Sequence, residues 1–167
     1  MLKKIFFSSF LLVIALALAA CQSPGQKVSE KMAEKAIEKA SGGKANVDIS
    51  KDQVNINTGE GSMKLGEDIK LPSDFPKDVY VYEGTIKAAI KSNDKNGYTI
   101  SIETDKAVSD IKAAYEEKLP VDGWKITGTM DFGTSASLAA EKDNRTVSVI
   151  IGLSDEKASI VLTVAEK

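Results

Sequence analysis

The amino-acid sequence predicts an α+β protein in which one helix covers one face of an antiparallel sheet. Apolar and polar residues alternate through most of residues 85–167, one internal stretch has helical spacing instead, and short turn segments separate the alternating stretches. The expected order is β-β-α-β-β-β-β, which gives a sheet of about six strands. A short helix and a small β-meander are expected before it.

The chain opens with two lysines in its first four residues, followed by an apolar run over residues 5–20 that only Ser8 and Ser9 interrupt. This layout is typical of a secretory signal peptide. A membrane-spanning helix needs about 20 apolar residues, and the polar sequence that begins at Gln22 leaves too few. Residues 1–20 are therefore predicted to be a signal peptide.

The end of this run contains the only cysteine of the chain, in the sequence Leu18-Ala19-Ala20-Cys21. These residues resemble the lipobox of bacterial lipoprotein precursors, and the resemblance implies that Cys21 carries a diacylglyceryl group and begins the mature chain. The alternative is ordinary cleavage after Ala19, which would leave an unpaired thiol in an oxidising compartment. Acyl chains such as palmitate on Cys21 are the better explanation, and two chains anchor a protein stably to a membrane.

The expected location is therefore the bacterial cell envelope. A residue other than aspartate after the cysteine, here Gln22, is similar to the signal for the outer membrane in cells with two membranes. In a cell with one membrane, the same anchor would place the domain on the outer face of the plasma membrane.

Charge composition excludes one class of partner. Removing 20 of 167 residues leaves 147, and the net charge changes from −2 to −4 because Lys3 and Lys4 leave with the leader. Lysine alternates with acidic residues along most of the chain, so no concentrated basic surface is expected and a nucleic-acid partner is excluded. With no second cysteine, apolar burial has to hold the fold.

After a tether at residues 21–26, a helix is predicted with Ser29 as its cap and with Gly42 and Gly43 after its end. Its repeating Glu-Lys pattern leaves only a narrow apolar face. We interpret it as a packed or spacer helix near the anchor, and a partner-binding or membrane-surface helix is the alternative. The apolar face consists of Val28, Met32, Ala36, Ile37 and Ala40.

Residues 27–66 are expected to form an N-terminal unit of this helix and a three-stranded meander, which has too little apolar surface to be stable alone. Residues 67–84 contain Pro72 and Pro76 and are expected to be an extended linker or an edge strand. Their phrase "LPSDFPKDVYVYEG" resembles small exported bacterial proteins of unassigned function. The alternating residues of the meander are Val47 and Ile49, Val54 and Ile56, and Met63 and Leu65.

Residues 85–167 are predicted to form the α+β sheet domain. Its helix should begin at a cap provided by Thr104 or Asp105 and stop at Pro120, with Val108, Ile111, Tyr115 and Leu119 on its buried face. Short joins make neighbouring strands antiparallel. The alternating strand residues are Ile86, Ala88 and Ile90; Tyr98, Ile100 and Ile102; Trp124, Ile126, Met130 and Phe132; Ala136, Leu138 and Ala140; Val147, Val149, Ile151 and Leu153; and Ile160, Leu162 and Val164.

The sheet face with Trp124 and Phe132 is expected to lie under the helix, with Trp124 in a structural role. Hydroxyls on the opposite face indicate contact with solvent. Ile150 and Val161 interrupt that face, and we expect them either to form the centre of a docking surface or to be covered by the first helix. The hydroxyl residues are Thr99, Ser101, Thr127, Thr129, Ser137, Thr146, Ser148, Ser159 and Thr163.

The sequence offers no catalytic, cofactor-binding or metal-binding residues that form a known pattern. The chain has no histidine, so the usual general base and the commonest metal ligand are missing. "SNDKNGYTISIE" partly matches a calcium loop with Asp94, Asn96 and Glu103 as ligands. Its flanks alternate as strands and its "NG" is a hairpin signal, so we expect a turn there and no metal.

Two functions are consistent with these features. The first is a lipid-anchored, non-catalytic interaction or structural module that contacts an envelope protein or the cell wall. The second is a carrier or sensor of a small or lipidic ligand held between sheet and helix, which would need a cavity of roughly 300 Å³ or more. An enzyme is not expected.

Overall fold

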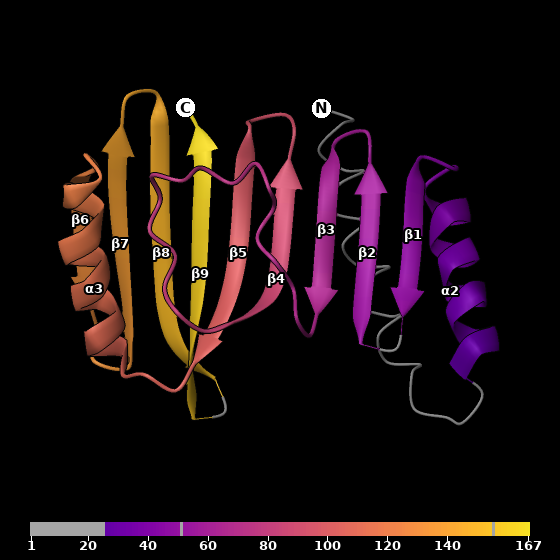
Figure 1. Cartoon of the computed structure of the whole chain (residues 1–167), viewed down its shortest axis with the longest axis horizontal. Coiled ribbons are helices and arrows are strands. Elements are labelled where there is room, and N and C mark those ends of the chain that lie inside the picture. Colours follow the sequence, from indigo (N-terminus) through magenta and orange to yellow (C-terminus); the bar gives the residue numbers. More distant parts are fainter. Residues whose placement is uncertain (1–25, 51, 155) are drawn as a thin grey trace.

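A computed structural model describes residues 26–167 except residues 51 and 155, and it shows an α+β architecture. Figure 1 shows one broad sheet with a helix near each end. The described elements are α2 (Gln26–Ala40), β1 (Ala45–Ser50), β2 (Gln53–Thr58), β3 (Gly61–Gly66), β4 (Thr85–Ser92), β5 (Gly97–Thr104), α3 (Val108–Val121), β6 (Lys125–Asp131), β7 (Ser135–Lys142), β8 (Arg145–Ser154) and β9 (Lys157–Glu166).

All strands belong to one 9-stranded antiparallel sheet with the order β1-β2-β3-β4-β5-β9-β8-β7-β6. The predicted order β-β-α-β-β-β-β after residue 85 is confirmed. The estimate of about six strands is too small, because the three strands of the meander belong to the same sheet. The last of these strands pairs with β4, with Met63 opposite Ile90, and this pairing extends the sheet by three strands.

The sheet has an α3 face and an α2 face, named for the helix that packs on each. Directly paired residues point to the same side of a sheet, so the register assigns every strand residue to a face. Ile100 and its partners Ala89 and Leu162 belong to the α3 face. Val47 and its partner Ile56 pack with Ile37 of α2 and belong to the α2 face.

The larger core lies on the α3 face between the sheet and α3, which packs against β6, β7 and β8. The predicted buried face of this helix is confirmed, since Ile111, Tyr115 and Leu119 have no exposed surface. The sheet residues beneath are equally buried; they include Ile100, Ile102, Leu138, Val147, Val149, Ile151, Ile160 and Leu162.

Residues 67–84 form a strap that completes the cover of the α3 face. Figure 1 shows the strap crossing in front of β4, β5, β9 and β8 before it returns to β4. It contains no strand, and Ile69, Phe75 and Val79 are buried in the larger core. The segment expected as a linker or edge strand therefore packs as part of the core.

The strap re-enters the sheet at Gly84, where a side chain would not fit. A Cβ placed there would lie 2.5 Å from the carbonyl oxygen of Glu103 and 2.7 Å from Ile102. Glycine thus permits the close approach that starts β4.

A second, smaller core lies on the α2 face at the other end of the sheet. It joins Ile37 to Ala45, Val47 and Ile56. Helix α2 ends where predicted, before Gly42 and Gly43, but it starts at Gln26, so Ser29 lies inside the helix and is not its cap. Ala36 and Ala40 are exposed and Met32 is 68% exposed, so the apolar face of α2 is only partly used.

The prediction that Phe132 is buried is wrong. Strand β6 contains a β-bulge between Ile126, which pairs with Ala140, and Gly128, which pairs with Ala139. The extra residue moves the following even-numbered positions to the opposite face. Met130 is therefore 59% exposed, and Phe132 lies just beyond the strand and is 71% exposed.

The same bulge places Thr129 on the α3 face, where it pairs with Leu138, and not among the hydroxyls of the opposite face. Leu153 was also expected in the core but is 56% exposed near the end of β8. Buried Trp124 directly precedes β6 and is 2% exposed, which confirms its structural position.

The predicted ends of the second helix need two corrections. Its N-cap is Ala107, which makes no side-chain capping bond, so neither Thr104 nor Asp105 is the cap. Pro120 lies in the last turn and the helix ends one residue later, at Val121. None of the described helices is long and apolar enough to cross a membrane.

We predict that Phe75→Ala lowers the free energy of unfolding by about 3 kcal/mol, because it removes a buried ring from the larger core. Leu71→Ala is the matched control on the same strap; Leu71 is 36% exposed, so its loss should stay under about 1 kcal/mol. Urea unfolding measures both changes. Equal losses would mean that the strap does not pack as described.

Candidate functional site

A ligand carrier of this architecture would hold its ligand between the sheet and its cover, and this space is filled. Tyr115 and Leu119 of α3 and Ile160 of β9 lie in this interior, and none of them has exposed surface. Within the part of the chain that the structure describes, the buried side chains occupy this interior without an unsatisfied polar side-chain atom.

Tyrosines join the strap to the helix within this interior. The backbone N–H of Tyr82 donates a hydrogen bond of 3.4 Å to the hydroxyl of Tyr115, and the ring of Tyr80 packs edge-on against Tyr115 at 5.3 Å. Burial raises the pKa of Tyr115 above its ordinary value, so the hydroxyl stays protonated. The group packs the core and offers no ionised oxygen for chemistry.

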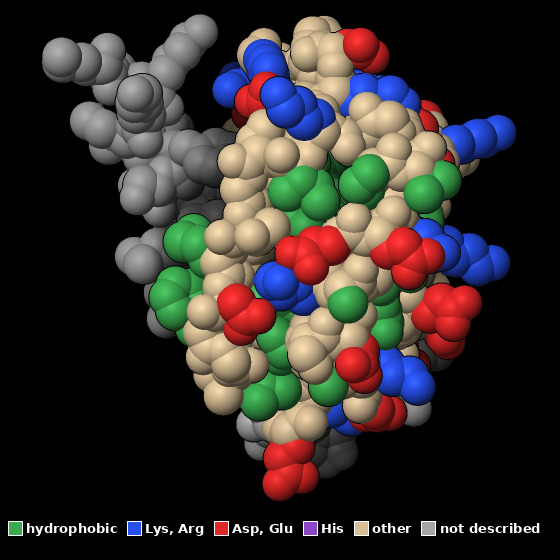
Figure 2. Space-filling view, turned by 90° about the vertical axis from the view of Figure 1, so that its left-hand side faces the viewer, with side chains coloured by type: hydrophobic (Ala, Val, Ile, Leu, Met, Phe, Trp, Pro, Cys, Tyr) green, Lys and Arg blue, Asp and Glu red, His purple; other side chains and the backbone are tan. Residues whose placement is uncertain are grey.

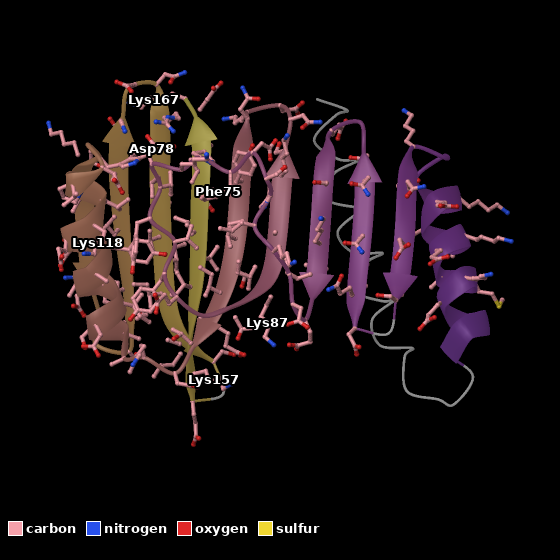
Figure 3. All side chains as sticks on the ribbon, viewed as in Figure 1. Phe75, Asp78, Lys87, Lys118, Lys157 and Lys167 are labelled. Carbon is pink, nitrogen blue, oxygen red and sulfur yellow. The ribbon has the colours of Figure 1, made fainter. Side chains whose placement is uncertain are left out.

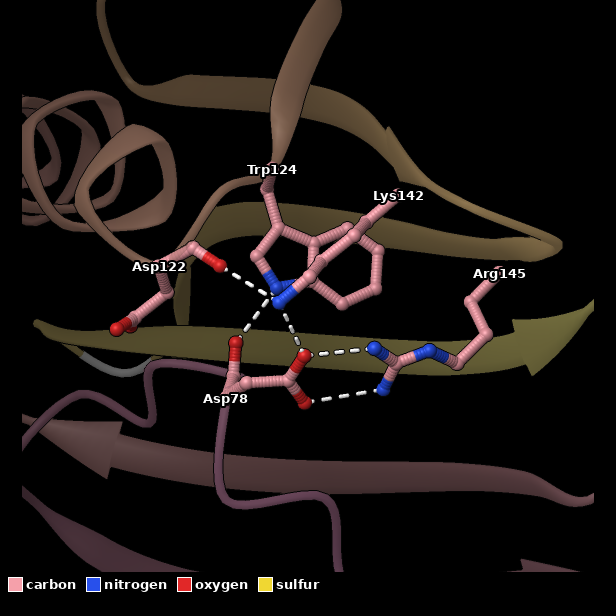
Figure 4. Close-up of polar contacts among 5 residues, drawn as sticks. All are labelled: Asp78, Asp122, Trp124, Lys142 and Arg145. Carbon is pink, nitrogen blue, oxygen red and sulfur yellow. Dashed lines mark hydrogen bonds and ion pairs between the residues drawn. The ribbon is translucent and has the colours of Figure 1, made fainter.

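A polar cluster fastens the far end of the strap to the sheet, and we call it the clamp (Figure 4). Arg145 donates two hydrogen bonds to the carboxylate of Asp78, at 3.0 and 2.6 Å, and Lys142 donates a third at 2.6 Å. The indole N–H of Trp124 donates to the backbone carbonyl of Asp78 at 2.6 Å. Lys142 also donates to the carbonyl oxygen of Asp122 at 2.7 Å.

The clamp is partly protected from water. The side chains of Asp78, Lys142 and Arg145 are 32%, 25% and 23% exposed, and the Arg145 guanidinium lies 5.0 Å from the centre of the Trp124 ring. Hydrogen bonds from Arg145 and then Lys142 hold the pKa of the Asp78 carboxyl well below its usual range. Both carboxylate oxygens of Asp78 and its backbone carbonyl accept hydrogen bonds from the protein, so the clamp is a structural tie.

Figure 3 shows how the strap spans the sheet, with Phe75 over its middle and Asp78 nearer the end where α3 packs. The side chain of Phe75 meets Tyr98 edge-on at 5.4 Å, and the Tyr98 hydroxyl donates to the carbonyl of Asp74 at 3.0 Å. An ion pair between Lys91 of β4 and Asp74 fixes the strap at the residue before Phe75. The strap is fixed at several points along its length.

One open depression of about 490 Å³ lies at the other end of the molecule, where α2 meets β1 and β2. It is separate from the larger core, and its lining is mostly polar: Glu38, Gly43, Lys44, Ala45, Asn46, Asn57 and Thr58. Its lining includes no group that the sequence analysis had identified as reactive.

The most distinctive surface is the middle of the α2 face. Two cross-strand rows, each with one residue from every strand, contain no charged side chain. The first row, from β1 to β6, is Ile49, Val54, Leu65, Ala88, Ser101, Val161, Ile150, Ser137 and Met130. The second is Val47, Ile56, Met63, Ile90, Thr99, Thr163, Ser148, Ala139 and Gly128.

The structure places the two expected docking residues side by side in the first row, where Ile150 pairs with Val161. Ile150 is 56% exposed and Val161 is half-buried. Helix α2 packs against β1 at the distant edge of the sheet and does not reach them. The predicted lipid-attachment residue, Cys21, lies outside the described residues.

The calcium-like segment forms the β4–β5 hairpin, as the strand pattern predicted, with Ser92 paired to Gly97. Asn96 lies in this turn, whereas Glu103 is near the other end of β5, 3.8 Å from both Lys87 and Lys157. The turn and Glu103 are therefore not brought together. Within the described residues, no three His, Cys, Asp or Glu side chains form a group that could hold a metal ion.

The clamp could not be found from the sequence, because its members come from the strap, the α3–β6 loop, β7 and β8 and meet only in the fold. One signal was available. Arg145 is the only arginine in a lysine-rich chain, and arginine is favoured over lysine where a carboxylate is bound in bidentate fashion.

Comparison with known proteins gives one finding. A family model described as START domain-like matches residues 85–157, which run from β4 into the start of β9. The match covers less than half of the 167 residues and does not include the strap. No curated protein and no solved structure matched the chain.

We predict that Asp78→Asn lowers the free energy of unfolding at pH 7 by about 1–3 kcal/mol, because two cations lose their anionic partner. The difference from the parent should shrink below about pH 4, where Asp78 of the unfolded parent takes up a proton while the folded carboxyl remains ionised. Urea unfolding at pH 7 and pH 3 tests this.

The matched control for the clamp is Asp74→Asn, which breaks a more exposed ion pair on the same strap. It should have the smaller effect at pH 7. An Asp78→Asn loss that is the same at pH 3 as at pH 7 would contradict the ionic role of Asp78.

Proposed function

We propose that this chain is a non-catalytic interaction module held at the bacterial cell envelope by acyl chains on Cys21. The observation that carries the interaction role is the uncharged middle of the α2 face, which combines apolar and hydroxyl side chains around Ile150 and Val161. Exposed apolar side chains that lie together on a surface favour contact with another macromolecule. The lipobox-like sequence and the apolar leader support the anchor.

The chemistry of the chain also favours a non-catalytic role. It has no histidine, and its single cysteine is the proposed attachment point. The clamp uses the carboxylate of Asp78 to bind Arg145 and Lys142. A carboxylate held this way is a poor general base, because its protonated form is disfavoured.

A ligand-binding module is the second candidate, and the START domain-like match favours it. The filled space between α3 and the sheet weighs against it, since a ligand there would have to displace the strap. Trp124 would report such a displacement because its indole N–H binds the strap at Asp78.

We predict that Cys21→Ala moves the protein from the membrane fraction to the soluble envelope or culture fraction, because the acyl chains have no other attachment point. Fractionation and immunodetection measure the change. Ser23→Ala, which leaves the lipobox-like sequence intact, is the control and should remain in membranes. Full membrane retention of Cys21→Ala would contradict the anchor.

We predict that phospholipid or fatty-acid micelles leave the Trp124 fluorescence spectrum unchanged, because the buried side chains under α3 leave no room for an acyl chain. Asp78→Asn, with a weakened clamp, should respond no more than the parent if ligand binding is not the function. A saturable spectral shift in the parent would instead favour the ligand-binding candidate.

A further inference from the structure

One corner of the sheet has three exposed apolar side chains that belong to neither core. Met130 lies near the end of β6 and Phe132 just beyond it, and Leu153 lies near the end of β8. The β6–β7 and β8–β9 hairpins are neighbours here, since Ser135 of β7 pairs with Gly152 of β8. We call Met130, Phe132 and Leu153 the apolar corner. Exposed apolar side chains that gather in this way indicate contact with another molecule.

The apolar corner lies at the same end of the sheet as the start of α2. Helix α2 ends before β1 begins and packs against it, so α2 starts beside the end of β1. The first uncharged row of the α2 face begins at Ile49, next to that end, and reaches Met130. Figure 1 shows the start of α2 and the β8–β9 turn at the lower end of the molecule.

The chain before α2 is short enough to keep this end close to a membrane. Under the proposed function, on which this inference rests, residues 21–25 join the acylated end of the chain to α2, and they span at most about 17 Å. The sheet is about 38 Å wide, since nine strands are spaced about 4.8 Å apart. The tether therefore holds one side of the lower edge of the sheet, and the apolar corner forms the other side.

The opposite end of the sheet differs in composition. Its hairpin turns, β2–β3, β4–β5 and β7–β8, contain only glycine, amide and charged residues. These turns are Gly59 and Glu60, residues 93–96, and Asp143 and Asn144. Val121, the last residue of α3, is exposed at that end and serves as a matched control below. Large apolar side chains in hairpins thus occur at the end from which the tether starts.

Charges around the apolar corner favour an apolar contact over attraction to anionic lipid. Lys157 is 3.8 Å from Glu103 and 3.9 Å from Asp105, and Lys112 is 3.9 Å from Asp131. Figure 2, which views this end of the sheet, shows hydrophobic side chains between acidic and basic ones, with an acidic side chain at the lowest point. Lysines that already face carboxylates add little attraction to anionic headgroups.

We propose that the apolar corner is a second membrane contact, in which Phe132 and Leu153 enter the boundary between lipid headgroups and acyl chains. Burial of one large exposed apolar side chain shifts an equilibrium roughly tenfold or more. A contact of this size does not hold a free protein on a membrane. A tether raises the effective concentration of the bilayer around the corner, so the same contact is sufficient to set the orientation of an anchored protein.

This contact determines how the proposed interaction surface is presented. With the tether at one side and the apolar corner at the other, the lower edge of the sheet lies along the bilayer and the strands stand away from it. The α2 face then points sideways across the membrane. Ile150 and Val161 are therefore turned toward other proteins of the envelope and away from the lipid.

The test uses the acylated full-length protein in phosphatidylcholine vesicles, with a fluorescent thiol label at Thr134→Cys in the β6–β7 turn. The acylated Cys21 does not react with the label. Lipids brominated near the top of their acyl chains should quench the label at Thr134→Cys. A label at Asn144→Cys, in the β7–β8 turn at the opposite end, should remain unquenched.

Substitution of the apolar corner should release the contact. In the labelled Thr134→Cys background, Phe132→Ser should lower the population in contact roughly tenfold and reduce the quenching accordingly. Val121→Ser is the matched control, because Val121 is even more exposed than Phe132 but lies at the opposite end. It should leave the quenching unchanged. Equal losses in the two variants would overturn the proposal.

Flotation of the vesicles separates failure of the contact from failure of the anchor. Protein that floats with the vesicles but is quenched equally at Thr134→Cys and Asn144→Cys overturns the contact and leaves the anchor intact. Protein that does not float overturns the anchor, and the contact with it. Quenching that appears only when phosphatidylglycerol replaces phosphatidylcholine would overturn the apolar contact. A cross-link from Thr134→Cys to an envelope protein in native membranes, without quenching by lipid, would overturn lipid as the occupant of the corner.

Discussion

The buried apolar side of the sheet changes at β4, from the α2 face in β1 and β2 to the α3 face in the strands after β4. The positions of α2, α3 and the strap depend on this change. Ala89 of β4 is buried on the α3 face, whereas its neighbours Ala88 and Ile90 lie on the α2 face beside Leu65 and Met63. The ladder of hydrogen bonds continues through this strand without interruption on the β3 side. One rigid sheet therefore has two cores on opposite faces, and each core needs its own helix.

The strap covers the strands of the α3 face that α3 does not reach. A helix of 14 residues is about 21 Å long and α3 packs on β6, β7 and β8, so it leaves β4, β5 and β9 without a helix above them. The strap covers these strands with an irregular backbone, which has no ladder of its own to hold it in place. The ties to Lys91, Trp124, Lys142 and Arg145 supply that constraint at separated points.

The extent of the START domain-like match limits what it implies about ligand binding. The matched residues include α3 and the strands beneath it, but neither the strap nor the α2 core. The strap occupies the side of the sheet on which α3 packs, together with Phe75 and Val79 of the larger core. A ligand held between α3 and the sheet of this chain would therefore have to displace the strap.

Local periodicity predicted the strands and helices because each is defined by its own residues. The alternation in residues 85–167 gave the strand order and the buried residues of α3, and the hairpin signal at Asn96 and Gly97 gave the β4–β5 turn. The exposed Phe132 could not be predicted, since the bulge before it depends on pairing with β7. The β3–β4 pairing joins residues on either side of the strap, and the clamp joins the strap itself to β7 and β8. No local sequence pattern contains such contacts.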